Sequence, residues 1–287
     1  MIYTLRAKYT KKYILMKEIS LDELKVIQMD VLTAIDKYCT QNGITYSLAG
    51  GTLLGAIRHK GYIPWDDDID IYLYRDDYNK LINTFPDIYE GRYKIASLER
   101  DKEWERPYAN AYDDKTIMIE NSTEKKHIGV FIDVFPIDNV PDDEIEWRKY
   151  DVPRRRMQKF HALRFIRYNK NRSFFKNIVV LLTRGLTAFI SRRRFAQYLD
   201  RLAKKYADCE TKYVFSNAQG IFVKRRFFKK VFDRVVELPF EDRSFKGFAD
   251  YDEYLRNAYG DYMKLPPVEK RISHHSFKAY WKDSDGA

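Results

Sequence analysis

The sequence predicts an α+β fold, in which a mixed β-sheet with flanking helices is joined to a basic helical subdomain. Three observations predict it. A helix-start signal at Ser20 is followed by apolar residues at helical spacing. Short alternating runs between residues 92 and 134 are typical of strands. From residue 147 to about 206 the chain becomes helical and strongly basic.

The elements of the first half follow in order. Ser20 and Glu23 form a capping box, which satisfies backbone N–H groups at the start of a helix. Asn42-Gly43 ends that helix. We then expect a strand over 44–49, a short helix over 52–59, a strand over 68–74 and a helix over 76–85.

The second half begins with β-like runs over 93–98, 108–112, 116–120 and 129–135. After the helical region, residues 213–215 and 222–223 are expected to be extended, 248–259 helical, and 265–281 a loop that folds back onto the core. We therefore divide the chain into a catalytic core (1–145), a basic helical subdomain (146–210) and a C-terminal segment that packs back on the core (211–287).

Charge is concentrated in one part of the chain. Residues 148–205 hold 18 Lys and Arg against two Asp, a net charge of +16, so the remainder sums to −6. Such a block indicates an anionic partner: a polyanionic glycan, anionic lipid or nucleic acid. With its phenylalanines (Phe160, Phe165, Phe174 and Phe175) it suits a helix lying on an anionic membrane. The alternative is a basic subdomain that binds acceptor phosphates or is solvated.

A nucleic-acid-binding module is the least favoured hypothesis. The basic block contains no recognisable RNA or DNA motif, and without a bound metal the carboxylate-rich loop would repel a phosphate backbone. Cys39 and Cys209 have no metal-ligand spacing, so we expect reduced thiols in a cytoplasmic protein. No signal-peptide h-region is visible, and the apolar run 178–190 is too short to span a bilayer. We expect a cytoplasmic location, peripheral on the inner membrane face if the basic block binds lipid.

Paired carboxylates are the most specific chemical feature. Asp68 and Asp70 are two apart in an alternating run, so in a strand both leave the same face. Two carboxylates at so short a separation repel each other, so we expect a positively charged partner between them. A divalent cation is the natural candidate: Mg²⁺, with Mn²⁺ as an alternative.

A third acid should come from a neighbouring strand. Asp133 is the best candidate, because a carboxylate in an otherwise apolar strand is expensive to bury without a function. A satisfied structural carboxylate is the alternative interpretation. Asp138 is the second choice and could simply cap a turn. Asp66 and Asp67 are either solvated turn residues or, for Asp67, a substrate contact.

Other residues suit an anionic substrate. Gly50-Gly51 lets the backbone approach a phosphate, and the helix expected from Thr52 points its first N–H groups at the same anion. Arg58 and Lys60 follow within reach, as substrate ligands or as ion-pair partners of the aspartates. His274 lies in the tail, which could bring it to the phosphate if the tail folds back; an ordinary surface position is the alternative.

The segment 48–71 resembles the signature of the LicD family, which includes fukutin and the fukutin-related protein. Segments 131–138 and 259–267 support the resemblance, which covers most of the chain from about residue 20 and is weakest over 148–205. It implies a nucleotidyltransferase-like fold. In that pattern Gly50-Gly51 matches the phosphate-loop glycines, Asp68 and Asp70 the paired metal-binding acids, and Asp133 the third acid.

The resemblance also implies a reaction. Bacterial proteins of the family that this chain resembles transfer phosphocholine from CDP-choline to a sugar hydroxyl of teichoic acid, lipopolysaccharide or another surface glycan, and release CMP. The animal relatives use CDP-ribitol as the donor. We therefore expect a CDP-alcohol donor, with CDP-choline favoured, and a glycan or lipid-linked glycan acceptor. Asp133 could also take the acceptor proton. A true nucleotidyltransferase with the same site is the alternative. An aromatic cage for choline is a further hypothesis, built from Trp65, Trp104 and Tyr108.

Overall fold

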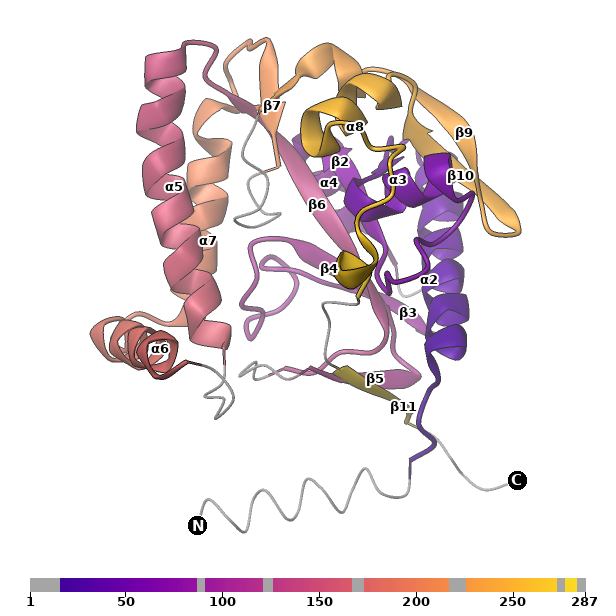
Figure 1. Cartoon of the computed structure of the whole chain (residues 1–287), viewed down its shortest axis with the longest axis horizontal. Coiled ribbons are helices and arrows are strands. Elements are labelled where there is room, and N and C mark those ends of the chain that lie inside the picture. Colours follow the sequence, from indigo (N-terminus) through magenta and orange to yellow (C-terminus); the bar gives the residue numbers. More distant parts are fainter. Residues whose placement is uncertain are drawn as a thin grey trace.

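A mixed β-sheet forms the centre of the molecule (Figure 1). The computed structural model describes residues 16–86, 91–120, 126–166, 173–216, 226–272 and 277–282. The seven-stranded sheet has the order β1-β2-β6-β4-β3, with β7 paired to β6 and β8 to β7. Its strands are β1 (Ser47–Leu48), β2 (Asp70–Tyr74), β3 (Tyr93–Ala96), β4 (Ala109–Asp113), β6 (Phe131–Val140), β7 (Tyr213–Phe215) and β8 (Phe227–Phe228). β2 and β6 run parallel, whereas the other paired strands run antiparallel.

Helices flank this sheet. α2 (Leu21–Gln41) begins at the predicted capping box, in which the Ser20 hydroxyl accepts a hydrogen bond from the Glu23 amide and the Glu23 carboxylate accepts one from the Ser20 amide. α2 packs against β4 and β6, while α3 (Gly50–Arg58) and α4 (Arg75–Thr84) pack against β2. Figure 1 shows α8 (Tyr251–Tyr259) in front of the sheet, beside α3. The predicted α+β architecture is confirmed.

The basic region is three helices rather than one run. α5 (Glu144–Phe165), α6 (Phe174–Leu186) and α7 (Arg192–Ala203) are followed by the short 3₁₀ turn η1 (Lys204–Tyr206). α5 packs against both α6 and α7, and α6 projects at the lower left of Figure 1. Pro153 lies inside α5 without ending it. Within the described residues, no helix combines the length and apolar character needed to cross a bilayer.

The C-terminal part contains strands that the sequence did not predict. β9 (Val235–Phe240) and β10 (Arg243–Phe248) form an antiparallel hairpin, and η2 (Lys229–Phe232) and η3 (Val268–Lys270) are short 3₁₀ turns. β11 (Phe277–Trp281) pairs with β5 (Thr116–Glu120), so the loop predicted over 265–281 is wrong at its end. β11 also contacts the segment before α2: the Ile19 amide donates to the Ala279 carbonyl (2.8 Å), and Ala279 is buried beside Ile19 and Met118.

Element boundaries also differ from those predicted. The strand expected over 44–49 is only Ser47–Leu48, and the helix expected over 248–259 starts at Tyr251 because Phe248 belongs to β10. β6 continues to Val140, beyond the predicted end at 135, since its last residues pair with β7. The extended segment predicted over 222–223 lies outside the described residues.

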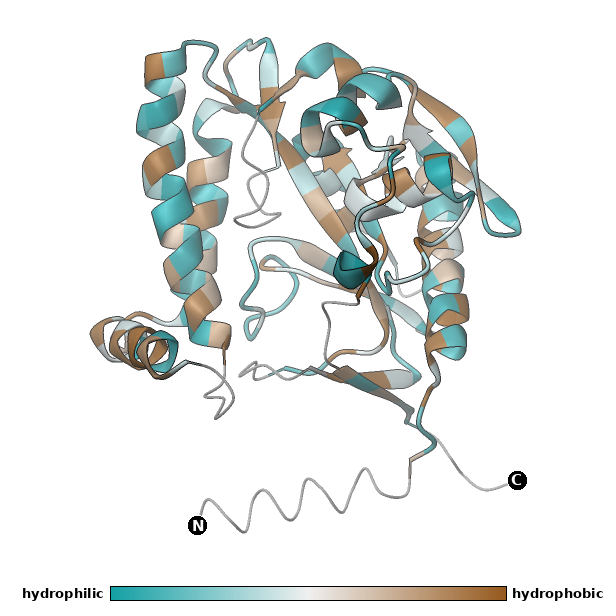
Figure 2. Ribbon diagram, viewed as in Figure 1, coloured by the Kyte–Doolittle hydropathy of each residue, from teal (hydrophilic) through white to brown (hydrophobic). Residues whose placement is uncertain are grey.

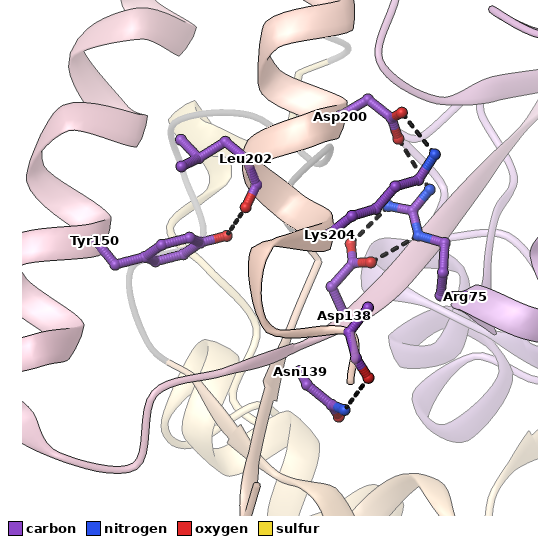
Figure 3. A network of polar contacts seen from close by, with 8 residues as sticks. Arg75, Asp138, Asn139, Tyr150, Asp200, Leu202 and Lys204 are labelled. Atoms are coloured by element: carbon purple, nitrogen blue, oxygen red, sulfur yellow. Dashed lines mark hydrogen bonds and ion pairs between the residues drawn. The ribbon is translucent and has the colours of Figure 1, made fainter. Parts of the chain in front are cut away.

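An ion-pair network fastens the helical region to the sheet (Figure 3). Arg75, at the start of α4, makes two parallel hydrogen bonds to Asp138 of β6, of 2.6 and 2.8 Å. The same guanidinium reaches Asp200 of α7 at 3.0 Å, and Lys204 contacts Asp200 at 2.7 Å. Arg75 and Asp138 are almost completely buried. Asp138 is therefore a structural ion-pair partner, neither a third metal ligand nor a simple turn cap.

Candidate active site

Asp70 and Asp133 lie side by side on the two parallel strands. The register pairs Asp70 of β2 with Asp133 of β6, and the Asp133 amide donates to the Ile69 carbonyl at 2.8 Å. Residues paired in this way on neighbouring strands direct their side chains to the same face of the sheet. The aspartate that we predicted to come from a neighbouring strand is therefore directly beside the Asp68/Asp70 segment.

Asp68 and Asp70 lie on either side of a buried isoleucine. Ile69 is fully buried, whereas both aspartates are half-buried. Asp68 precedes β2, which begins at Asp70, so the strand predicted over 68–74 starts two residues later than expected. Asp67 is different: it is only 6% exposed, and its carbonyl accepts a hydrogen bond from Gln28 of α2. Asp67 is thus less accessible to a substrate than the predicted role requires.

Asn110 holds the Asp133 carboxylate in place. It lies on β4 in register with Asp133, is fully buried, and donates its side-chain amide to Asp133 Oδ1 and to the Ile132 carbonyl (3.3 Å). The sequence interpretation missed this residue. A single amide between Ala109 and Ala111 in a buried strand was the available signal, because a buried polar side chain needs a hydrogen-bond partner.

The start of α3 is tied to the same part of the sheet. The Thr52 hydroxyl accepts a hydrogen bond from the Asp70 amide at 2.9 Å, and the Gly50 amide donates to the Tyr254 hydroxyl at 3.2 Å. Thr52 is buried, so it positions Asp70 rather than presenting its hydroxyl to a ligand. Gly50 has φ of 53°, a left-handed conformation that favours glycine.

Gly51 is needed for close approach to a carboxylate. A Cβ atom at this position would lie 2.7 Å from Asp66 Oδ2. Asp66 therefore lies against the first turn of α3, where the helix dipole favours negative charge. The Gly-Gly pair lets an acidic side chain approach the helix start, and the same space is where a donor phosphate was predicted.

Arg58 ends α3 and forms a cationic group with Arg271. It donates to the Tyr262 carbonyl (2.7 Å) and to the His59 ring (2.9 Å). Burial, and to a lesser degree the like charge of Arg271, lower the pKa of Arg58. Burial, and then Arg58, also lower the pKa of His59, which favours the neutral ring that can accept this bond. Arg271 stacks over Trp65 at 5.6 Å.

Tyr259 of α8 lies near the carboxylates. Burial, and then the charges of Tyr254, Asp70, Asp66 and Asp68, raise the pKa of its phenol. It is also within range of Arg58. No role for Tyr259 or Arg271 was predicted, although the segment 259–267 contributed to the family resemblance. Arg271 had no signal in the sequence, because only the folded tail brings it to Trp65.

The remaining predicted residues are placed less favourably. Lys60 is exposed in a turn with φ of 62°, and its carbonyl accepts from the Glu241 amide at 2.7 Å. His274 lies outside the described residues. The aromatic cage stays a prediction: Arg106 lies over Trp104 (5.9 Å) and Tyr108 (5.8 Å), and Arg271 lies over Trp65.

Comparison with known proteins identifies the family of this chain. Residues 43–179 match the model for the LicD/FKTN/FKRP nucleotidyltransferase domain. The chain is 31% identical to the lipopolysaccharide cholinephosphotransferase LicD of Haemophilus influenzae over 92% of this chain and 99% of that protein. The chain belongs to the LicD family. It is therefore a transferase with the nucleotidyltransferase-like fold that the sequence predicted.

More distant relatives of this LicD-family chain match a short part of it. The human ribitol 5-phosphate transferase FKRP is 54% identical over 35 residues, 12% of this chain and 7% of that protein. An uncharacterized Rickettsia prowazekii protein is 42% identical over 57 residues, about one fifth of each chain. The family model includes all three predicted acids but ends before α7, so Tyr259 and Arg271 lie outside it.

The carboxylates fit a cation that takes few protein ligands. In the described parts of the chain, no three His, Cys, Asp or Glu side chains are grouped so that they would hold a metal by themselves. Mg²⁺ usually binds through one or two carboxylates and completes its coordination with water and substrate phosphates. Asp70 and Asp133, adjacent and half-buried, provide such a pair. The participation of Asp68 stays a prediction.

Proposed function

We propose that this LicD-family enzyme transfers phosphocholine, or a similar phospho-alcohol, from a CDP-linked donor to a hydroxyl of a cell-surface glycan. The similarity to a lipopolysaccharide cholinephosphotransferase over nearly its full length supports the transferred group and the glycan acceptor. The pairing of Asp70 with Asp133 at the start of α3 supports a site for a diphosphate with a divalent cation, Mg²⁺ or Mn²⁺. Lipopolysaccharide, teichoic acid and capsule precursors are the acceptors to compare.

The reaction requires one bond to form and one to break. The acceptor hydroxyl oxygen attacks the phosphorus that carries the alcohol, and the bond from this phosphorus to the bridging oxygen breaks. CMP leaves with that electron pair, and the hydroxyl proton passes to a base, for which Asp133 is the proposed group. Bound Mg²⁺ would offset charge on the diphosphate oxygens through Asp70 and Asp133.

Arg58 and Arg271 are the proposed cations for the donor phosphates. Both are half-buried and belong to one electrostatic group with Tyr259, which is also within range of the carboxylates. Two guanidinium groups near each other are destabilising unless an anion lies between or beside them. A leaving CMP phosphate would supply that charge, and its negative charge increases as the bridging bond breaks.

A panel of CDP-alcohols tests the proposal directly. The protein is incubated with Mg²⁺, lipopolysaccharide or teichoic acid, and CDP-choline, CDP-ribitol, CDP-glycerol or CDP-ethanolamine, and released CMP is measured. We expect one donor to give acceptor-dependent CMP release that EDTA abolishes. A label on the alcohol should appear on the glycan. A label on the nucleoside monophosphate appearing there instead would establish the alternative, a true nucleotidyltransferase.

Two substitutions test the site itself. Asp70→Asn and Asp133→Asn each remove a charge without changing side-chain size, so we expect CMP release to fall by at least about a hundredfold while the fold is retained. Asp242→Asn, at a carboxylate that is 81% exposed, is the matched control and should retain activity. Retained turnover in Asp70→Asn or Asp133→Asn would contradict the assignment of that residue.

A further inference from the structure

Helix α6 presents an apolar face to solvent. Phe175, Val179, Leu182 and Leu186 recur at intervals of four, three and four residues, so they share one side of the helix. All four are exposed, Phe175 by 77% and Leu186 by 73%, and Phe189, just beyond the helix, is 79% exposed. Figure 2 shows the brown colour of apolar residues on this projecting helix. We call these five residues the α6 apolar face.

The opposite side of α6 has the reverse character. Its buried residues are Asn177, Val180 and Thr183, two of which are polar, and α5 is the helix packed against α6. A surface helix of a water-soluble domain normally buries its apolar stripe and exposes its polar side. Large contiguous apolar patches on a protein surface indicate an interaction site. The orientation of α6 therefore requires an apolar environment outside the molecule.

A cation borders this face. Lys176 is exposed and lies one residue after Phe175 and three before Val179, at the edge of the apolar residues. Arg184 is also exposed, but it is two residues from both Leu182 and Leu186 and therefore lies on the other side of α6. Arg194 is exposed at the start of α7. Other basic side chains of this region point inward: Arg192 pairs with Glu105 at 2.6 Å, and Arg193 donates to the Leu98, Asp101 and Trp104 carbonyls. The basic block thus contains residues that fasten the helices to the core, such as Arg192 and Arg193, and exposed residues, of which Lys176 borders the α6 apolar face.

We propose that α6 lies in the surface of an anionic lipid bilayer, with its apolar face among the acyl chains and its exposed cations at the headgroups. Apolar insertion combined with lysine or arginine is how peripheral helices bind anionic membranes. A helix of 13 residues is about 20 Å long, shorter than the roughly 30 Å hydrocarbon core, so α6 lies on the membrane rather than across it.

Charge favours lipid over a second copy of this chain. Lys176 borders this face, and residues 148–205 carry a net charge of +16, so a symmetric contact here would bring two strongly basic surfaces together. Like charges in an interface oppose association. Anionic headgroups complement the same residues. The inference does not depend on the transfer reaction proposed above, because it rests on the exposed side chains of α6 and their neighbours alone.

Vesicle co-sedimentation of the whole chain tests the proposal without donor or acceptor. The probes are vesicles of phosphatidylcholine alone and of phosphatidylcholine mixed with an equal amount of phosphatidylglycerol. We expect binding to the mixed vesicles that weakens with added salt. The double variant Leu182→Glu/Leu186→Glu should bind at least about tenfold more weakly. Lys176→Glu/Arg184→Glu should reduce the preference for anionic vesicles.

The matched control places the same charges on exposed apolar residues elsewhere. Val26 and Ile145 are 59% and 65% exposed on α2 and α5, and Val26→Glu/Ile145→Glu should bind like the parent. Circular dichroism and thermal melting confirm that each variant is folded. Equal binding by the Leu182→Glu/Leu186→Glu variant and the control would overturn the proposal. So would a dimer in light scattering that this variant dissociates without any vesicle binding, which would assign the face to a second copy.

Discussion

Asn110 determines how the Asp133 carboxylate can be oriented. Its side-chain amide donates a hydrogen bond to one oxygen of the Asp133 carboxylate, which fixes the orientation of that carboxylate relative to β4. Outer hydrogen bonds of this kind orient metal-binding carboxylates and raise the affinity of the site. The orientation of the Asp133 carboxylate therefore depends on Asn110, a neutral residue.

Replacing Asn110 by alanine removes this support and keeps all carboxylates. We expect Asn110→Ala to lower turnover by about 10- to 100-fold and to raise the Mg²⁺ concentration needed for half-maximal activity. The measurement is CMP release against Mg²⁺ concentration, with thermal melting as the test of folding. A lower melting temperature with an unchanged Mg²⁺ dependence would show that Asn110 is only structural.

Individual residues were predictable where the chemistry is local in sequence. Asp68 and Asp70 are two residues apart, and Asp133 stood out as an acid in an apolar strand. Asn110 was missed although its place between two alanines of a buried strand was a signal. Tyr254 and Arg271 were not predictable, because each contacts a partner far away in the chain. Thr52 lies in the predicted place, but its hydroxyl bonds the Asp70 amide instead of facing a ligand.

Helix α5 docks on the core through a buried histidine. His161 is 7% exposed, and its ring is hydrogen-bonded to the Glu105 carbonyl at 2.8 Å. Burial lowers the pKa of His161 to about 4, with a further contribution from nearby arginines. The ordinary value is about 6.5, so between these values the unfolded chain binds a proton that the folded protein excludes. The free energy of unfolding therefore falls as pH decreases through this window.

His161→Gln should flatten this part of the pH profile. Glutamine offers a donor for the Glu105 carbonyl and has no proton to gain. Between about pH 6.5 and pH 4 we expect the parent to lose up to about 3 kcal/mol more unfolding free energy than the variant. Urea unfolding at several pH values measures this difference. Parallel curves for the two proteins would show that folding does not lower the pKa of His161.

Elements were predictable where local patterns determine them. α2 has its own capping box and apolar spacing, and the observed helix matches it. The β9–β10 hairpin was missed because Pro239 and Gly247 lie within the two strands and weaken the strand pattern. β11 is a strand because β5 offers it an edge, which no local pattern reveals.

The whole molecule is held together by charges buried between its layers. Arg75 joins α4, β6 and α7, since it contacts both Asp138 and Asp200. Arg193 of α7 likewise donates to three carbonyls of the segment before β4, and Arg192 pairs with the Glu105 carboxylate. The sequence predicted a basic helical region, but charge counting alone did not reveal that much of this charge serves to attach it to the sheet.

Arg75→Met should destabilise the protein strongly. It leaves Asp138 buried without its partner, and breaking a buried pair in this way costs about 3–5 kcal/mol. Chemical denaturation gives the loss in unfolding free energy. Arg256→Met, which breaks an exposed pair with Asp252, is the matched control and should change little. Equal effects of the two substitutions would contradict a structural role for the Arg75 network.

The parallel register of β2 and β6 has a consequence for ion binding. The paired residues run from Asp70–Asp133 to Tyr74–Ile137. These five successive pairs hold Asp70 and Asp133 next to each other on the two strands. Neither strand can shift to separate them without losing that ladder. Relief of their mutual repulsion must then come from outside the backbone, as a proton, a hydrogen-bond donor or a cation. Asn110 already donates one hydrogen bond to Asp133, and a cation bound between the two acids would reduce their repulsion further. The rigid register of the two strands therefore favours cation binding here even without substrate.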